Sequence, residues 1–163
     1  MEDKSTNVCQ EDTYKKLFYQ HAEKLFRFLL LKFNNEDLAR DAMQEAFIVL
    51  WENCQKVTLN NAKSYVFTVA RNRAIDSIRK EKLHLRIVEE DKIIITDELL
   101  EDNSDQLKKM NFILSKLPEG SKEVFLMNRI HEMTYAEIAK ELDISVKAVE
   151  KRMSVALKII REN

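Results

Sequence analysis

The sequence holds one glycine, Gly120, and one proline, Pro118, among its 163 residues. β-Hairpins, dinucleotide-binding turns and phosphate-binding loops need glycine for positive φ angles or for close approach of the backbone. A chain with a single glycine is therefore not expected to build them. Because the helix formers Leu, Lys, Glu and Ala predominate, the sequence predicts an all-α protein.

Long apolar runs are also missing. No stretch reaches the roughly 18 to 20 apolar residues of a membrane span, and the start Met1 to Lys4 lacks the basic and then apolar layout of a signal peptide. We therefore expect a cytoplasmic protein without membrane insertion.

The sequence also lacks clusters of residues that could bind a metal or carry out catalysis. Cys9 and Cys54 lie far apart without partner spacing, so neither a disulfide framework nor a zinc site is expected. The three histidines are scattered, and no metal or other cofactor is predicted. With no glycine-rich loop and no visible pair of nucleophile and base, the chain is not expected to be an enzyme.

The net charge of −1 is distributed unevenly along the chain. Residues 1–82 carry a net charge of +2, residues 83–106 carry −6 and residues 107–163 carry +3. This pattern predicts two small helical domains, 1–82 and 107–163, joined by an acidic linker, 83–106. The linker includes Ile93 to Ile95, which either dock on a partner or pack transiently on the chain's own domains.

The N-terminal domain shows two amphipathic helices. Apolar residues recur at helical spacing from Tyr14 to Leu29, and a second helix is predicted from about Glu36 to Gln55. The second helix has a buried stripe consisting of Ala39, Ala42, Met43, Ala46, Val49 and Leu50. Its opposite face groups acidic and amide side chains around apolar ones: Asp41, Gln44, Glu45, Ile48, Trp51 and Glu52. Such a face is typical of protein interfaces, although another helix of the same domain could instead cover Ile48 and Trp51.

A polar stretch, Lys56 to Lys63, precedes a third helix predicted from about Ser64 to Lys82. Its basic side chains lie near the aromatic residues Tyr65 and Phe67, which suits phosphate contacts combined with base stacking on single-stranded DNA. The alternative is a basic helix end that is merely solvated.

The C-terminal domain carries the clearest local signal. Thr134 and Glu137 form a capping box at the start of a short helix, Asp143 stands at a turn, and Ser145 can cap the final helix. A short helix, a three-residue turn and a helix with a basic outer face are typical of the helix-turn-helix, which inserts its second helix into the major groove. The alternative is an ordinary packed pair of helices.

Two segments in the N-terminal domain resemble those of bacterial sigma factors. Asp41 to Glu52 (DAMQEAFIVLWE) looks like the signature helix, and Val69 to Lys80 (VARNRAIDSIRK) resembles the promoter-melting helix. In the C-terminal domain, Leu117 to Glu119 and Thr134 to Ala139 are similar to the part that reads the minus 35 element. With two domains and a short linker, the chain resembles the extracytoplasmic-function (ECF) group of the sigma-70 superfamily.

This resemblance implies a dissociable initiation subunit of bacterial RNA polymerase, with sigma region 2 in residues 1–82 and region 4 in residues 107–163. It implies contacts with the clamp helices of the largest polymerase subunit and with the flap, as well as with promoter DNA and an anti-sigma factor. The clamp helices would bind the face defined by Asp41, Gln44, Glu45, Ile48, Trp51 and Glu52. The acidic linker would thread towards the RNA exit channel.

The resemblance also implies two sets of DNA-binding residues. Minus 10 contacts fall on Lys56, Lys63, Ser64, Tyr65, Arg71, Asn72, Arg73, Arg79 and Lys80. Minus 35 contacts fall on Ser145, Lys147, Glu150, Lys151, Arg152, Ser154 and Lys158. Because Glu150 and Val155 stand where basic residues are common in the family, we expect a shallower salt dependence of minus 35 binding.

Two other functions fit parts of the pattern. A stand-alone helix-turn-helix regulator would dimerise through its N-terminal helices and bind a palindromic site without polymerase. A protein-interaction module would have no role in DNA binding. Tight duplex binding in the absence of polymerase distinguishes the first of these from a sigma factor.

Overall fold

The computed structural model describes residues 7–87 and 105–163. Within these residues the chain forms seven α-helices and no strand, which confirms the all-α prediction. The chain divides into two compact units, Met1–Lys92 and Ile93–Asn163.

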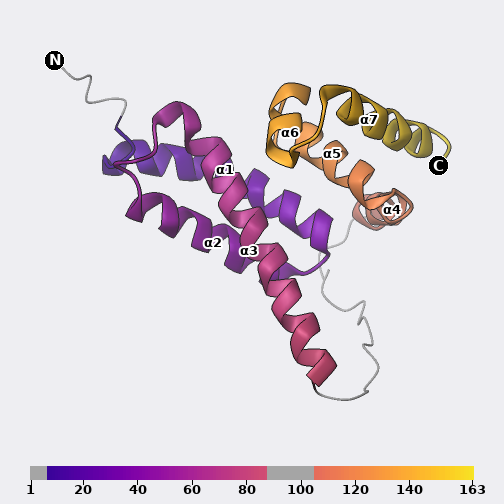
Figure 1. The fold of residues 1–163 in the computed structure, drawn as a ribbon, viewed down its shortest axis with the longest axis horizontal. Coiled ribbons are helices and arrows are strands. Elements are labelled where there is room, and N and C mark those ends of the chain that lie inside the picture. The colour runs from indigo at the N-terminus through magenta and orange to yellow at the C-terminus, as the bar shows by residue number, and fades with distance from the viewer. Residues whose placement is uncertain (1–6, 88–104) are drawn as a thin grey trace. The chain divides into compact units, whose positions relative to one another are not determined.

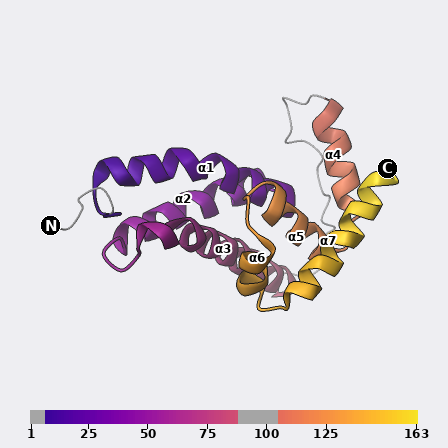
Figure 2. The ribbon, with the colours of Figure 1, turned by 90° about the horizontal axis from the view of Figure 1, so that it is seen from above.

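The first unit consists of α1 (Glu11–Phe33), α2 (Glu36–Glu52) and α3 (Leu59–Ile87), which pack side by side (Figures 1 and 2). α1 ends at Asn34, whose backbone adopts the left-handed conformation with φ 51°, a geometry that Asn tolerates better than most residues. Asn35 then begins α2 by accepting a hydrogen bond from the Leu38 N–H at 2.9 Å. This two-residue link reverses the chain, so that α1 and α2 run antiparallel.

The core of the first unit forms where aromatic side chains of all three helices meet. Phe28 of α1, Phe47 of α2 and Phe67 of α3 are fully buried, and the ring centroids of Phe28 and Phe67 lie 4.9 Å apart. The prediction that Phe67 stacks on DNA bases is therefore wrong. Its ring fills the core instead, since the side chain points to the face of α3 that packs on α1 and α2.

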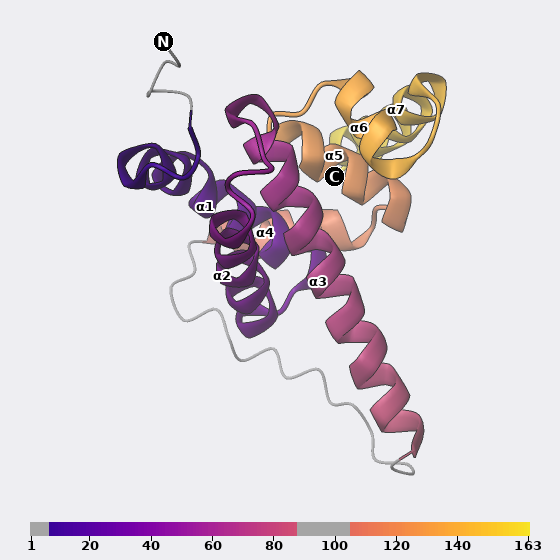
Figure 3. The ribbon, with the colours of Figure 1, turned by 60° about the vertical axis from the view of Figure 1, so that its left-hand side comes forward.

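The bounds of α2 and α3 differ from the prediction. α2 ends at Glu52, and α3 begins at Leu59 and continues through Ile87. Most of the polar stretch from Lys56 to Lys63 therefore belongs to α3, and this helix runs past residue 82 into the predicted linker. No glycine or proline interrupts this stretch, so nothing in it stops helix propagation. The C-terminal part of α3 extends beyond α1 and α2 (Figure 3).

A disulfide joins Cys9, just before α1, to Cys54, just after α2, with their Cα atoms 5.0 Å apart. The expectation that these cysteines are unrelated is wrong. Because α1 and α2 are antiparallel, residues 45 positions apart in sequence come together at one end of the helix pair. Sequence separation gave no sign of this proximity.

The second unit contains α4 (Asp105–Ser115), α5 (Glu119–Arg129), α6 (Tyr135–Leu142) and α7 (Val146–Arg161) (Figure 1). α5, α6 and α7 share a core that includes Val124, Met127, Ile138, Val149 and Met153. Most of the predicted acidic linker, including the three isoleucines 93–95, lies outside the described residues.

Local hydrogen bonds build the helix-turn-helix as predicted. The Thr134 side chain accepts from the Glu137 N–H at 3.2 Å, and the Glu137 carboxylate accepts from the Thr134 N–H at 2.7 Å, which completes the capping box. Asp143 adopts the left-handed conformation with φ 52°, and the Ser145 hydroxyl caps α7 by accepting from the Ala148 N–H at 3.1 Å. These features confirm the expected start of α6, turn and start of α7.

Candidate functional site

The outer face of α2 is a surface of acidic and apolar side chains. All six residues predicted for this face are exposed, with Ile48 exposed by 56% and Trp51 by 45%. The helices that the structure describes in this unit therefore leave Ile48 and part of Trp51 exposed, while α1 covers the rest of the Trp51 ring. The remaining members of this face are Asp41, Gln44, Glu45 and Glu52.

Ile48 and Trp51 form one wall of an open groove of about 420 Å³ between the end of α2 and the start of α1. The other wall consists of Glu11, Tyr14 and Lys15. We call these five residues the docking groove. The rings of Tyr14 and Trp51 meet edge to face with centroids 5.0 Å apart, so the two walls are in contact.

Tyr14 also fixes the position of this wall. Its hydroxyl donates a hydrogen bond of 2.7 Å to the carbonyl oxygen of Phe47 on α2. Burial raises the pKa of the Tyr14 hydroxyl, so this donor stays protonated to a higher pH than an exposed tyrosine would. Periodicity had placed Tyr14 in the core stripe of α1, and it cannot distinguish a side chain at the centre of a stripe from one at its edge.

The rim of the docking groove is charged. Lys15 and Glu11 form an ion pair of 2.6 Å. The hydrogen bond from Lys15 lowers the pKa of the Glu11 carboxyl, and the same bond raises the pKa of the Lys15 ammonium. With the acidic side chains of α2 close by, the groove fits a partner that offers apolar anchors among basic residues.

The predicted minus 10 residues lie along α3, apart from Lys56, which lies in the turn before it. Tyr65, Asn72 and Arg79 are seven residues apart, so they follow one another along a single face of the helix. Asn72 and Arg79 are exposed and Tyr65 is half-buried.

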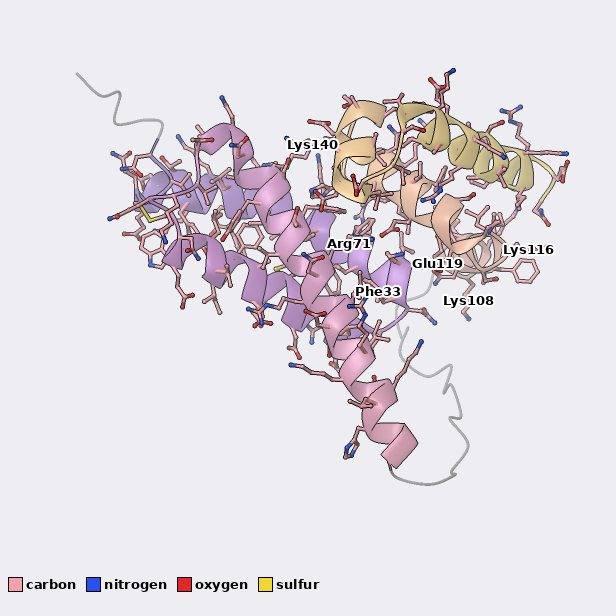
Figure 4. The ribbon with its side chains drawn as sticks, viewed as in Figure 1. Phe33, Arg71, Lys108, Lys116, Glu119 and Lys140 are labelled. Carbon is pink, nitrogen blue, oxygen red and sulfur yellow. A yellow bond between two sulfur atoms is a disulfide. The ribbon has the colours of Figure 1, made fainter. Side chains whose placement is uncertain are left out.

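The other predicted minus 10 residues flank this face on α3. Ser64, Arg73 and Lys80 are exposed, whereas Lys63 and Arg71 are half-buried. Figure 4 labels Arg71 on this helix.

One ion pair connects the outer face of α2 with α3. Glu45 and Arg73 lie 3.2 Å apart, and both side chains are about half exposed. An exposed pair of this kind contributes at most about 1 kcal/mol to stability. It nevertheless places a residue predicted to bind polymerase next to one predicted to bind DNA.

The outer face of α7 is basic along its length. Lys147, Lys151 and Lys158 are spaced by four and seven residues and are all exposed, so they form one stripe. The other predicted residues on this side, Ser145, Glu150 and Ser154, are exposed too. This is the helix that enters the major groove in a helix-turn-helix.

Arg152 does not join this stripe. Its guanidinium packs against Gly120 of α5, so closely that a β-carbon on Gly120 would lie 3.2 Å from the Arg152 Cζ. The side chain is half-buried, whereas that of the neighbouring Lys151 is exposed. The only glycine of the chain thus makes room for the arginine between two helices of the unit.

Residues 7–87 and 105–163 contain no cluster of three or more His, Cys, Asp or Glu side chains that could hold a metal ion. None of the described helices is long and apolar enough to cross a membrane.

Comparison with protein families finds two matches, one in each unit. Residues 17–84 match the model described as Sigma-70 region 2, and residues 109–160 match Sigma-70, region 4. The first match covers most of α1 to α3 and the second covers the helix-turn-helix. Together they account for well over half of the chain.

Several known proteins resemble the chain over most of their length. It is 24% identical to the ECF RNA polymerase sigma factor SigM of Bacillus subtilis (strain 168) over 136 residues, which cover 82% of this chain and 83% of that protein. It is also 24% identical to the ferric citrate uptake sigma factor FecI of Escherichia coli (strain K12), with 96% and 93% covered.

Two solved structures share the fold. One is CnrH in complex with the cytosolic domain of CnrY, with a TM-score of 0.67 and 22% identity over 94% of this chain and 88% of that chain. The other is the sigma factor RpoE in complex with the anti-sigma factor NepR from Bartonella quintana, with a TM-score of 0.71 and 20% identity over 91% and 94%.

Proposed function

Because this chain belongs to the sigma-70 superfamily of RNA polymerase sigma factors, in the extracytoplasmic-function group, we propose that it binds bacterial core polymerase in the cytoplasm and directs promoter-specific initiation. Members of this family are transcription initiation factors rather than enzymes. The observation that carries the proposal is the order of the two matches, region 2 followed by region 4 on separate units. A stand-alone regulator is not favoured, since it would not account for the region 2 match.

The docking groove and the outer face of α2 bind the clamp helices of the largest polymerase subunit. This assignment rests on the exposure of Ile48 and Trp51 within the region 2 match and on the acidic side chains that surround them. An exposed tryptophan beside an isoleucine, ringed by polar groups, has the composition of an interface hot spot.

The exposed face of α3 captures the minus 10 element, and the stripe on α7 reads the minus 35 element. Asn72 and Arg79 can contact unpaired bases and phosphates, while the half-buried Tyr65 offers an aromatic edge for stacking. On α7, Lys151 can donate to guanine or phosphate and Glu150 can accept from cytosine. Arg152 supports the domain rather than the DNA contact, because its guanidinium lies against α5.

An anti-sigma factor is a further expected partner. The matched structures of CnrH and RpoE each contain another protein, described for RpoE as an anti-sigma factor. The proposed functional division is region 2 in residues 1–82, the acidic linker in residues 83–106 and region 4 in residues 107–163.

Run-off transcription tests the proposal. Fragmented genomic DNA of the source bacterium is transcribed by core RNA polymerase with and without this protein. New discrete transcripts that depend on the protein are the expected result. Unchanged transcription, together with tight binding to duplex DNA alone, would contradict it.

Binding to core polymerase tests the docking groove. Ile48→Glu and Trp51→Ala are expected to weaken binding about thirtyfold, the effect of removing an interface hot spot. Tyr19→Glu is the control, because Tyr19 is exposed by 80% on α1 but does not line the groove. Equal affinities for all these variants would refute the assignment of this surface.

A further inference from the structure

The disulfide between Cys9 and Cys54 joins the chain segments next to the two walls of the docking groove. Cys9 is two residues before Glu11 on one wall, and Cys54 is three residues after Trp51 on the other. The bond therefore links the two chain segments that carry the two walls. Both cysteines are half-buried rather than enclosed, so small thiols and redox proteins can approach them.

Local hydrogen bonds hold each of the two helix ends that the disulfide joins. Gln10, at the start of α1, makes no side-chain capping hydrogen bond. α2 ends without a left-handed cap and without a basic residue in its last turn, and both the N–H and the side-chain amide of Asn53 donate to the Val49 carbonyl. These bonds hold each end to its own helix and do not join one end to the other, so they do not fix the spacing between α1 and α2. The disulfide links α1 and α2 here together with the Tyr14 hydrogen bond, the ring contact between Tyr14 and Trp51 and the buried Val8.

We propose that the Cys9–Cys54 pair is a redox-reactive site that controls the docking groove. With the bond closed, the two walls are held at the spacing seen in the structure, and the groove binds its partner tightly. With the bond open, the two walls are less restrained, Trp51 becomes more accessible and binding weakens. The effect on binding rests on the proposed function, whereas the effect on Trp51 does not.

The chemistry requires a disulfide oxidant and a dithiol reductant. On closing, the two cysteine thiols give up two protons and two electrons, and glutathione disulfide accepts them as two glutathione thiols by way of a mixed disulfide at one cysteine. On opening, a thiolate of a reduced dithiol attacks one cysteine sulfur. Its second thiol then releases the mixed disulfide, so that the reductant ends as its own disulfide and both cysteines end as thiols.

Fluorescence quenching tests the site without polymerase, because Trp51 is the only tryptophan of the chain. The full-length protein is treated with glutathione disulfide or with dithiothreitol, its thiols are counted, and circular dichroism verifies that both forms are folded. Acrylamide is expected to quench Trp51 more strongly in the reduced form. Equal quenching of both forms, or two free thiols after oxidation, would overturn the proposal.

The variant that combines Cys9→Ser and Cys54→Ser is the matched control for this measurement, because it has no thiol that glutathione disulfide could convert to a mixed disulfide. It cannot form the bond, so it should show the quenching of the reduced form under both treatments. A difference between the treatments that persists in this variant would refute the assignment to the disulfide.

Binding to core polymerase gives the second measurement. The reduced protein is expected to bind about five- to tenfold more weakly than the oxidised protein, a usual size for coupling between two sites. Equal affinities would overturn control of docking. If neither form binds core polymerase while quenching of Trp51 still depends on the redox state, the proposed function fails and the redox site stands.

Discussion

Individual residues at the start of α1 and at the end of α2 decide the shape of the docking groove. Tyr14 combines a ring contact with Trp51 and a hydrogen bond to the backbone of α2. The acceptor of this hydrogen bond is the carbonyl oxygen of Phe47, whose side chain is buried in the core. The Tyr14 hydroxyl therefore lies at the edge of the core. A sequence pattern that marks Tyr14 only as apolar misses this second role.

Tyr14→Phe tests the importance of this hydrogen bond. Loss of the bond to the Phe47 carbonyl is expected to lower the free energy of unfolding of the first unit by about 1 kcal/mol. Tyr19→Phe is the control, because Tyr19 is almost fully exposed and should change stability by less than about 0.5 kcal/mol. Urea titration of both variants provides the comparison, and equal stabilities would contradict the prediction.

Lys151 and Arg152 are adjacent in sequence but lie in different surroundings. Lys151→Ala is expected to reduce the slope of log affinity against log salt concentration by about one for duplex minus 35 DNA, since one phosphate contact is lost. Arg152→Ala should leave the slope unchanged, because its guanidinium packs on Gly120. A slope that falls equally in both variants would show that Arg152 turns outward to bind DNA.

For the helices, the capping residues at the helix ends predicted the structure better than the residues inside the helices did. The capping box at Thr134, the left-handed Asp143 and the cap at Ser145 are all found where the sequence predicted them. These features involve residues within four positions of one another, so local chemistry determines them. The bounds of α2 and α3 were less predictable, since polar residues such as Asn60 and Asn61 fit either a loop or the first turn of a helix.

Thr134→Ala tests the capping box. Removing the side-chain acceptor leaves the Glu137 N–H without its cap and should lower the free energy of unfolding of the second unit by about 1 kcal/mol. Ser154→Ala is the control, because Ser154 is exposed within α7 and caps no helix. Thermal unfolding followed by circular dichroism measures both, and a neutral Thr134→Ala variant would contradict the prediction.

For the whole molecule, the division into two units predicts that a change in one leaves the other intact. Cys54→Ser removes a crosslink that closes a loop of 45 residues, and it should lower the free energy of unfolding of the first unit by about 2–4 kcal/mol. Probes in the second unit should report an unchanged transition. Hydrogen exchange of the core amides of both units provides the measurement.

The control for this prediction is reduction of the wild-type protein. Dithiothreitol should destabilise the first unit of the wild type by the same amount and have no further effect on Cys54→Ser. A shift of the second unit in either case would contradict independent unfolding of the two units.

Composition and short-range pattern were enough to predict the helical class, the helix-turn-helix and the acidic and apolar face of α2. Each of these depends on helical periodicity, or on hydrogen bonds between residues close in sequence. One glycine and one proline in the whole chain already exclude most other folds.

Only the tertiary structure decided which side chains meet across helices. The pairing of Cys9 with Cys54, the burial of Phe67, the placement of Arg152 against Gly120 and the second wall of the docking groove all depend on helix packing. Periodicity gives the face of a helix on which a residue lies, but it does not give the neighbour that packs against that face. In the first unit the neighbour is set by the antiparallel turn at Asn34 and by the fit of the core. In the second unit it is set by the packing of α7 on α5.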